Sequence, residues 1–226
     1  MATLYVVATP IGNLGDITLR AIEALKAVDL IVCEDTRHSR HLLTHLGISK
    51  PLISGHGHNE SSTAPRVIDA LNEGRDVAYV SDAGTPGISD PGRVIVREVR
   101  ASGFDVVPLP GPSALTALLS VNAFPGKTVT FEGFLSPKSG RRKNRLSELL
   151  ERDESFLLYE SPHRVLKLLQ ELSDLDSRRQ VLFGRELTKL HEEILEGTAG
   201  EILEIIANRP SIKGEIALLV GSSKKG

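Results

Sequence analysis

The sequence has 226 residues, enough for one large domain or for two of about 110 residues each. Hydrophobic residues make up 40% and charged residues 25%, which is ordinary for a globular enzyme and excludes a largely disordered chain. The formal net charge is −2, from 27 basic and 29 acidic side chains. A protein that coats nucleic acid non-specifically is usually far more basic, so any contact with RNA must come from a local basic patch.

Neither export nor membrane insertion is indicated. No apolar run approaches the roughly 18 residues that a membrane span needs, and the N-terminus has no signal-peptide pattern. Cys33 is the single cysteine, which excludes an intrachain disulfide and a cysteine-rich zinc site. We therefore expect a soluble, cytoplasmic protein with no membrane partner.

Short apolar strands and amphipathic helices alternate through the first half of the chain. Leu4–Ala8 is fully apolar, which is typical of a strand buried on both faces of a parallel sheet. Asp16 or Thr18 can cap the helix that follows. Further strands are expected at Leu30–Cys33, Asp76–Val80 and Phe104–Leu109, and further helices near His38–Leu46, from Pro65 to Gly74, at Val94–Ala101 and at Ser113–Val121. This order predicts right-handed crossovers and an open parallel sheet covered by helices.

The second half repeats this alternation with a more mixed pattern. Asn122–Lys127 is the best linker and predicts two α/β domains, residues 1–121 and 122–226. Glu192–Glu196 alternates in polarity and is expected to form an antiparallel edge strand. Other strands are expected at Thr128–Glu132, Phe156–Tyr159, Gln180–Phe183 and Glu215–Val220, and helices after Pro162 and at Gly200–Ala207.

Three expected strand ends of the first half are rich in glycine and proline: Thr9–Asn13, Ser81–Gly92 and Pro110–Ala114. Glycine lets the backbone approach a ligand closely, and proline holds a loop open without needing a partner for an N–H. Ser113 is also a plausible helix N-cap. One such loop is typical of an ordinary turn, whereas three on alternate strand ends of one sheet favour a ligand pocket at its carboxyl edge.

The nature of the ligand is only partly constrained by these loops. A dinucleotide fingerprint needs Gly-x-Gly-x-x-Gly after the first strand, but Pro10 occupies the first glycine position and leaves Gly12 and Gly15. Glu34 and Asp35 stand where a ribose-binding acid belongs, which keeps a nicotinamide cofactor as a second choice. The chain has no Gly-Lys-Ser/Thr phosphate loop.

Six motifs together resemble a known family: ATPIGN, CEDTR, SDAGTPGISDPG, PGPSA, YESPHR and GRELTK. They look like the tetrapyrrole-methylase-fold superfamily from Leu4 to about Val220, and EDTR, DAGTPGISDPG and YESPHR point to its ribosomal-RNA branch. The resemblance implies two α/β domains, an N-terminal parallel sheet and a C-terminal mixed sheet, with S-adenosylmethionine in the cleft between them. It also implies a homodimer that methylates the 2′-hydroxyl of a decoding-region cytidine, on 16S rRNA or the small ribosomal subunit.

The resemblance also assigns cofactor contacts to individual residues. Those expected to border the cofactor or to cradle its methionine end are Pro10, Asp82, Ala83, Gly84, Ile88, Ser89, Ser113 and Ala114. Those expected to close over the adenosine are Tyr159, Leu187, Gly214, Glu215 and Ile216. Family members usually continue into a small helical C-terminal domain, so a chain that stops at Gly226 is expected to be truncated or a short variety.

Chemistry at a sulfonium methyl mainly requires alignment, because the methyl group is already electrophilic; positioning of this kind can contribute roughly 7–11 kcal/mol. A general base near a ribose hydroxyl could add about 10²–10⁴ in rate. Candidates for a base or orienting group are Asp35 with Arg37, and Glu160. A surface ion pair or helix cap explains Asp35 and Arg37 equally well. Glu186, between Arg185 and Lys189, is a weaker candidate.

A basic run without acidic residues follows the second domain's first expected strand: Lys138, Arg141, Arg142, Lys143 and Arg145. Such a run is compatible with a solvated helix face or with phosphate binding. The family resemblance favours RNA, and Arg37, Arg40 and Arg164 are expected to extend the patch.

No metal is expected, although His38, His41 and His45 share a helical face and His56-Gly57-His58 follows. Two alternatives to an rRNA methyltransferase stay open on sequence. One is a methyltransferase of the same fold that acts on a tetrapyrrole-like small molecule. The other is a non-catalytic nucleotide-binding module.

Overall fold

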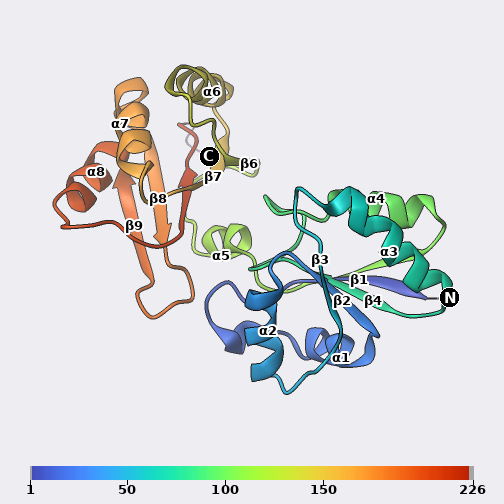
Figure 1. The fold of residues 1–226 in the computed structure, drawn as a ribbon. Coiled ribbons are helices and arrows are strands. Elements are labelled where there is room, and N and C mark those ends of the chain that lie inside the picture. The colour runs from blue at the N-terminus through green and yellow to red at the C-terminus, as the bar shows by residue number, and fades with distance from the viewer. Residues whose placement is uncertain (1, 224–226) are drawn as a thin grey trace. The chain divides into compact units, whose positions relative to one another are not determined.

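The computed structural model describes residues 2–223, and the chain divides into two compact domains, residues 1–113 and 114–226 (Figure 1). The division falls before helix α5 (Ala114–Ser120), whereas the sequence placed the boundary after it. The reason is packing: α5 lies against a strand of the second domain, and a Cβ at Gly184 would come within 2.9 Å of Leu118 Cδ1. The linker residues 122–127 therefore lie inside the second domain.

The first domain is built on a five-stranded sheet in the order β3-β2-β4-β1-β5, in which every pair is parallel. Its strands are β1 (Thr3–Val7), β2 (Leu30–Cys33), β3 (Leu52–Ser54), β4 (Val77–Val80) and β5 (Asp105–Leu109). The predicted open parallel sheet is confirmed. Strand β3 was not anticipated, because three residues are too few to show a periodic pattern.

Helices cover both faces of this sheet, as the right-handed crossover rule requires. They are α1 (Leu19–Ala27), α2 (Thr36–His45), α3 (Glu60–Asn72) and α4 (Arg93–Ala101), with a short 3-10 turn at Leu14–Asp16. Leu25 and Leu43, of α1 and α2, share one core cluster with Ile31, while Val67 and Ile95, of α3 and α4, share the other. Figure 1 shows these two helix pairs on opposite sides of the strands. No helix that the structure describes is both long and apolar enough to cross a membrane.

Side-chain hydrogen bonds hold the first turns of α1 and α3. Thr18 caps α1 by accepting a hydrogen bond from Ala21 N at 3.1 Å, as expected. The prediction that Pro65 opens a helix is wrong, because α3 begins at Glu60. Its first turn is held from the preceding segment, where Thr63 Oγ1 donates to Ser54 O at 3.0 Å. Glu60 accepts a hydrogen bond from Gly92 N, which ties the same turn to the start of α4.

The glycine-rich loops follow β1, β4 and β5, which are neighbours in the sheet rather than alternate strands. Since the strands are parallel, the three loops emerge at one edge. Strand β2 adjoins β4 on the other side, and their onward connections diverge, β2 towards β3 and β4 towards β5. An open sheet binds ligands where the connections of neighbouring strands diverge in this way, so the β2 and β4 ends belong to the same candidate site.

The second domain carries a mixed sheet in the order β6-β7-β10-β8-β9. Its strands are β6 (Val129–Phe134), β7 (Ser155–Glu160), β8 (Gln180–Arg185), β9 (Glu193–Thr198) and β10 (Ile216–Val220). Strands β6 and β7 are parallel and the other pairs antiparallel, so the predicted mixed sheet and the antiparallel edge strand β9 are confirmed.

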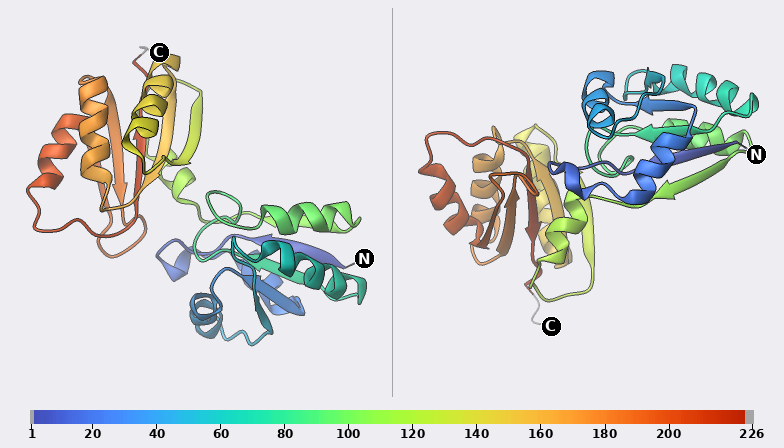
Figure 2. Two further views of the ribbon diagram at one scale, coloured as in Figure 1. Left: turned by 45° about the horizontal axis from the view of Figure 1, so that its top comes forward. Right: turned by 90° about the horizontal axis from the view of Figure 1, so that it is seen from below.

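Three helices cover one face of this second sheet: α6 (Ser139–Arg152), α7 (Val165–Leu175) and α8 (Ala199–Ala207). Their apolar side chains form one cluster with alternate residues of β7, β8 and β10, such as Phe156 and Leu158. Figure 2 shows the three helices beside the strands from a second direction. Helix α5 packs against β10, where Leu219, which alternates with Leu218 and Val220 of the helix-covered face, is completely buried.

A buried ion pair joins α6 to α7. The Arg142 guanidinium donates from Nε to Glu171 Oε2 at 2.6 Å and from Nη2 to Glu171 Oε1 at 2.8 Å, and Ser139 Oγ donates to the same carboxylate at 2.8 Å. Both charged side chains are 3% exposed or less, so the removal of one leaves the other buried without its charge partner. The hydrogen bonds from Arg142 lower the pKa of Glu171 from its ordinary value.

We predict that Arg142→Ala lowers the free energy of unfolding by about 3–5 kcal/mol, because it leaves Glu171 buried and unpaired. Urea denaturation measures this, with the exposed neighbouring variant Arg141→Ala as control, for which a change below about 0.5 kcal/mol is expected. The pair Arg142→Met with Glu171→Leu should recover most of the loss. Equal destabilisation by Arg141→Ala and Arg142→Ala would contradict the assignment.

The same pair predicts a pH dependence. The pKa of Glu171 is depressed in the folded protein, so its contribution to stability is present above the unfolded-state pKa of about 4.3 and is lost as the pH falls through the folded-state value. The advantage of the wild type over Arg142→Ala should therefore be constant near neutrality and shrink in acid.

Candidate functional site

The loops after β1 and β4 are joined by backbone hydrogen bonds. Thr9 N donates to Gly84 O at 2.9 Å, and Gly84 N donates to Thr9 O at 3.0 Å. Gly84 has a φ of +80°, which favours glycine, and a Cβ there would lie 3.2 Å from Ile11 Cγ2. The two loops therefore form one surface that a side chain at position 84 would disturb.

The loop after β5 is attached to the same surface. Thr85 Oγ1 donates to Pro112 O at 3.1 Å. Gly111 lies so close to the end of β1 that a Cβ would come 3.0 Å from Ala8 Cβ. The structure thus brings together the loops that carry these predicted cofactor residues of the first domain: Pro10, Asp82, Ala83, Gly84, Ile88, Ser89 and Ser113. Ala114 follows Ser113 as the first residue of the second domain.

Two acidic segments meet at the diverging ends of β2 and β4. Asp35 N donates to Asp82 Oδ1 at 2.9 Å, which fixes the end of β2 against the loop after β4. Burial raises the pKa of Glu34, and the neighbouring Asp82 carboxylate adds to the rise. The sequence offered Glu34 only as half of a dinucleotide pattern, and its burial and proximity to Asp82 come from the pairing of β2 with β4.

Asp35 and Arg37 form both the helix cap and the surface ion pair that the sequence had left open as explanations. Asp35 caps α2 by accepting from Arg37 N at 2.8 Å, and its carboxylate also pairs with the Arg37 guanidinium at 2.8 Å. The Arg37 side chain is 88% exposed. Hydrogen bonds from Arg37 hold the pKa of Asp35 well below its usual range. A carboxylate of low pKa is a weak base, so Asp35 is better suited to orient a partner than to remove a proton.

The prediction of a catalytic role for Glu160 does not fit its position. Glu160 continues the alternation of Phe156 and Leu158, which face the helices, whereas Tyr159 points to the opposite face. Its side chain is 1% exposed and is used locally: Oε1 accepts from Ser161 N at 2.7 Å, and Oε2 forms an ion pair with Arg164 at 3.0 Å. The structure therefore assigns Glu160 to the turn between β7 and α7.

The predicted adenosine contacts gather at one end of the second sheet. Ile216 pairs with Glu160 of β7 and Arg185 of β8, and Leu187 packs beside Gly184. Tyr159 makes edge-to-face contacts with Phe131 and Phe134, at centroid distances of 5.1 and 5.8 Å.

The backbone around this end is fixed by an ionic network. Glu186 N donates to Glu215 O and Glu215 N to Glu186 Oε1, both at 2.9 Å. Lys189 Nζ donates to Glu186 and Glu215 at 2.8 and 2.9 Å, and its hydrogen bond lowers the pKa of Glu186. Gly214 has a φ of +93°, and any Cβ there would collide with Glu186. The weaker catalytic candidate Glu186 is therefore a paired, structural carboxylate.

The predicted RNA-binding residues separate into two groups. Arg40, Lys138, Arg141 and Lys143 are exposed. Arg145 is paired with Glu132 and Glu148, and Arg164 with Glu160, so much of their charge is already compensated. The prediction that Arg142 contacts RNA is wrong, because its side chain is 2% exposed and bound to Glu171. A signal was present in the sequence, since Arg142 shares a helical face with Leu146 and Leu149.

The histidines that suggested zinc do not gather around a common centre. His38, His41 and His45 are exposed on α2. His56 and His58 contact one another edge to face, with ring centroids 6.0 Å apart. Within residues 2–223, no group of three or more His, Cys, Asp or Glu side chains is arranged to hold a metal ion.

The family model described as Tetrapyrrole (Corrin/Porphyrin) Methylases matches residues 3–203. The chain belongs to the tetrapyrrole methylase family. A relative from Xylella fastidiosa, named Ribosomal RNA small subunit methyltransferase I, is 47% identical over 96% of this chain and 81% of its own length. A relative of the same name from Borrelia garinii is 44% identical over 97% of this chain and 99% of its own. The resemblance to the ribosomal-RNA branch is confirmed.

Solved structures of the family share the fold. A cobalt precorrin-4 methyltransferase aligns with a TM-score of 0.69 at 18% identity, covering 97% of this chain and 94% of the other. A uroporphyrin-III C-methyltransferase from Thermus thermophilus aligns with a TM-score of 0.65 at 17% identity, covering 98% and 94%. At these identities the likeness concerns the fold alone, and it confirms the predicted pair of α/β domains.

We predict that Asp82→Ala weakens the attachment of the β2 end to the loop after β4. The Asp35 amide loses a charged acceptor, so its hydrogen exchange should accelerate by about tenfold or more, in line with the roughly 1.5–3 kcal/mol of a hydrogen bond to a charged group. Amide exchange read by NMR checks this. Asp82→Asn keeps an acceptor oxygen and should retain much of the protection; identical exchange in Asp82→Ala and wild type would contradict the role given to Asp82.

Proposed function

We propose that this protein transfers a methyl group from S-adenosylmethionine to rRNA of the small ribosomal subunit. The observation that carries the proposal is the carboxyl edge of the first sheet, where three loops are joined through Thr9, Gly84 and Thr85 into one surface. The shared name and the 43–47% identity of the curated relatives support rRNA as the acceptor, whereas the solved precorrin and uroporphyrin methyltransferases that share the fold are 16–18% identical.

The residues at this edge fit S-adenosylmethionine better than a dinucleotide. Glu34, Asp35 and Asp82 place carboxylates around the ends of β2 and β4. Acids at the end of β2 also suit the ribose of a dinucleotide, but the Asp82 carboxylate in the glycine-rich loop after β4 would repel a pyrophosphate and attract the cationic sulfonium or ammonium group of S-adenosylmethionine. Pro10 at the first glycine position of the fingerprint also disfavours a dinucleotide.

We assign the cofactor contacts as the sequence predicted them. In the first domain these are Pro10, the Asp82–Gly84 backbone, Ile88, Ser89 and Ser113, followed by Ala114. In the second domain they are Tyr159, Leu187, Gly214, Glu215 and Ile216. The fixed backbone around Glu186 and Gly214 supports this second set, because a rigid segment binds a ligand at a smaller entropic cost than a mobile one.

When bound, S-adenosylmethionine supplies a methyl group that is already electrophilic, so the task of the chain is to align the acceptor. We propose that Asp35 and Arg37 orient it: the pair is fixed at the start of α2, and the guanidinium is exposed to an incoming phosphate or hydroxyl. We further propose the 2′-hydroxyl of a decoding-region cytidine in 16S rRNA as the acceptor, and a cytoplasmic homodimer as the active form, both from the family resemblance.

Methyl transfer itself is the first test. We expect labelled S-adenosylmethionine to label small ribosomal subunits from a strain that lacks the activity, and mapping to place the label on one ribose. Arg37→Ala should lower kcat by about tenfold or more because the acceptor is less well aligned, whereas Arg100→Ala, exposed on α4, should match the wild type. No label in the rRNA would refute the proposal, and label in a tetrapyrrole instead would favour a small-molecule enzyme.

A second test concerns the RNA surface. Lys138, Arg141 and Lys143 are exposed at the start of α6. We predict that Arg141→Ala with Lys143→Ala weakens binding to small-subunit rRNA and reduces the slope of log Kd against log salt by about two, one for each phosphate that the variant no longer neutralises. The affinity for S-adenosylmethionine, measured by calorimetry, should not change.

The matched control is Arg66→Ala with Arg100→Ala, which removes two exposed arginines from α3 and α4. It should leave the salt slope as in the wild type. If both double variants reduce the slope equally, RNA affinity depends on net charge alone, and the α6 surface has no special role.

A further inference from the structure

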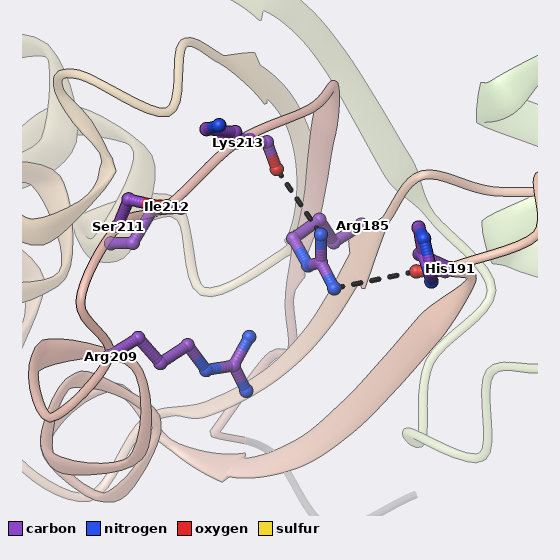
Figure 3. A pocket seen from close by; sticks show the side chains of 6 residues that line it. All are labelled: Arg185, His191, Arg209, Ser211, Ile212 and Lys213. Carbon is purple, nitrogen blue, oxygen red and sulfur yellow. Dashed lines mark hydrogen bonds between the residues drawn. The ribbon is translucent and has the colours of Figure 1, made fainter.

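A basic pocket in the second domain lies outside all the residues assigned so far. It has a volume of about 260 Å³ and is lined by Arg185, His191, Arg209, Ser211, Ile212 and Lys213. Figure 3 shows the two guanidinium groups and Lys213 around the hollow. Arg185 comes from the end of β8, His191 from the β8–β9 loop, and the other four from the segment between α8 and β10.

One half of the pocket is fixed by a single carboxylate. Glu193 Oε2 accepts from Arg185 Nε at 3.0 Å and from Arg209 Nη1 at 2.7 Å, and Oε1 accepts from Arg209 Nη2 at 2.6 Å. These hydrogen bonds lower the pKa of Glu193 to about 2, and those from Arg209 have the largest effect. Arg185 also donates to Lys213 O and His191 O, at 3.3 and 3.4 Å, as Figure 3 shows. The guanidinium groups are therefore held in place before any ligand arrives.

The other half is free to bind. The side chains of His191, Ser211 and Lys213 are exposed and make no hydrogen bond or ion pair with any residue of the described chain. Glu192 and Glu215 are not part of the lining: Glu192 accepts from Thr188 N at 2.5 Å, and Glu215 accepts from Lys189, which it shares with Glu186, at 2.9 Å. Among the residues that line the pocket and their ion-pair partner Glu193, three permanent positive charges thus stand against one carboxylate.

We propose that this pocket binds a phosphate group of the RNA substrate. The guanidinium N–H groups that Glu193 and the two carbonyls leave unused, such as Arg209 Nε–H and the second hydrogens on the Nη atoms, can donate to phosphate oxygens, and Lys213 adds a mobile ammonium. The pocket also borders the proposed cofactor contacts, because Lys213 immediately precedes Gly214–Ile216. A phosphate held here would position the RNA beside that segment. This inference rests on the proposed function for the identity of the ligand, but not for the existence of an anion site.

Inorganic phosphate tests the site without any assay of activity. We expect its titration to shift the side-chain NMR signals of Arg185, Arg209 and His191 together and in a saturable manner, with sodium chloride at equal ionic strength as reference. His191→Ala with Lys213→Ala should weaken this binding by about tenfold, as expected when charge-assisted hydrogen bonds are removed. Lys167→Ala, exposed on α7, is the matched control and should bind as the wild type does.

A variant that is expected to bind phosphate more tightly distinguishes the loss of a binding group from a general loss of folding. Glu193→Gln keeps the size of the side chain and removes the compensating charge, so phosphate should bind about tenfold more tightly. Weaker binding in Glu193→Gln, or unchanged binding in the His191 and Lys213 double variant, would overturn the proposal. So would binding of oligoglutamate without binding of phosphate, which would indicate an acidic protein as the partner.

Measurements with small-subunit rRNA distinguish a failure of this inference from a failure of the proposed function. The His191 and Lys213 double variant should raise the KM for small-subunit rRNA and reduce the salt slope by about one or more, with the affinity for S-adenosylmethionine unchanged. If the wild type methylates rRNA and the double variant matches Lys167→Ala, the inference fails alone. If the wild type transfers no methyl group to rRNA, the proposed function fails, while the phosphate titration still decides whether the anion site exists.

Discussion

Hydrogen bonds between loops at the carboxyl edge of the first sheet are the constraint on which the rest of the site depends. Parallel strands bring their ends to one edge, but loops that leave them are ordinarily independent of one another. Here Thr9 and Gly84 exchange two backbone hydrogen bonds, and Thr85 reaches the carbonyl of Pro112. Asp82 holds the end of β2 from the other side. The edge is thus preorganised, so less conformational entropy is lost when a ligand binds.

Much of the fold could be predicted because the hydrophobic pattern and the connection rules agree. Leu30–Cys33 is apolar throughout and forms a strand buried on both faces. Glu192–Glu196 alternates in polarity, and all of it except Glu192 lies within the edge strand β9. The errors occurred where tertiary contacts outweigh local signals. Helix α3 begins before Pro65 because Ser54 and Gly92 hold its first turn. Helix α5 joins the second domain because Leu118 packs beside Gly184, a contact between residues far apart in the sequence.

The candidate site was predictable in its loops and much less so in its side chains. Glycine and proline mark a loop by their own conformational limits, so composition locates it without knowledge of the fold. The role of a charged side chain depends on the face of its element. Glu160 continues the inward alternation of Phe156 and Leu158, and Arg142 lies one helical turn from Leu146; both residues are buried and paired. Residue type suggested chemistry at these positions, while the periodicity indicated packing.

The charge distribution of the second domain follows from the same distinction. Carboxylates hold several of its arginines: Glu171 binds Arg142, Glu132 and Glu148 bind Arg145, and Glu193 binds both Arg185 and Arg209. A count of basic residues therefore overstates the positive charge that RNA can reach. Unpaired charge in this domain remains on exposed side chains such as Lys138, Arg141, Lys143 and Lys213. A chain with a net charge of −2 can in this way carry local basic surfaces, at exposed lysines and Arg141 and at the pocket where Arg185 and Arg209 share the single carboxylate of Glu193.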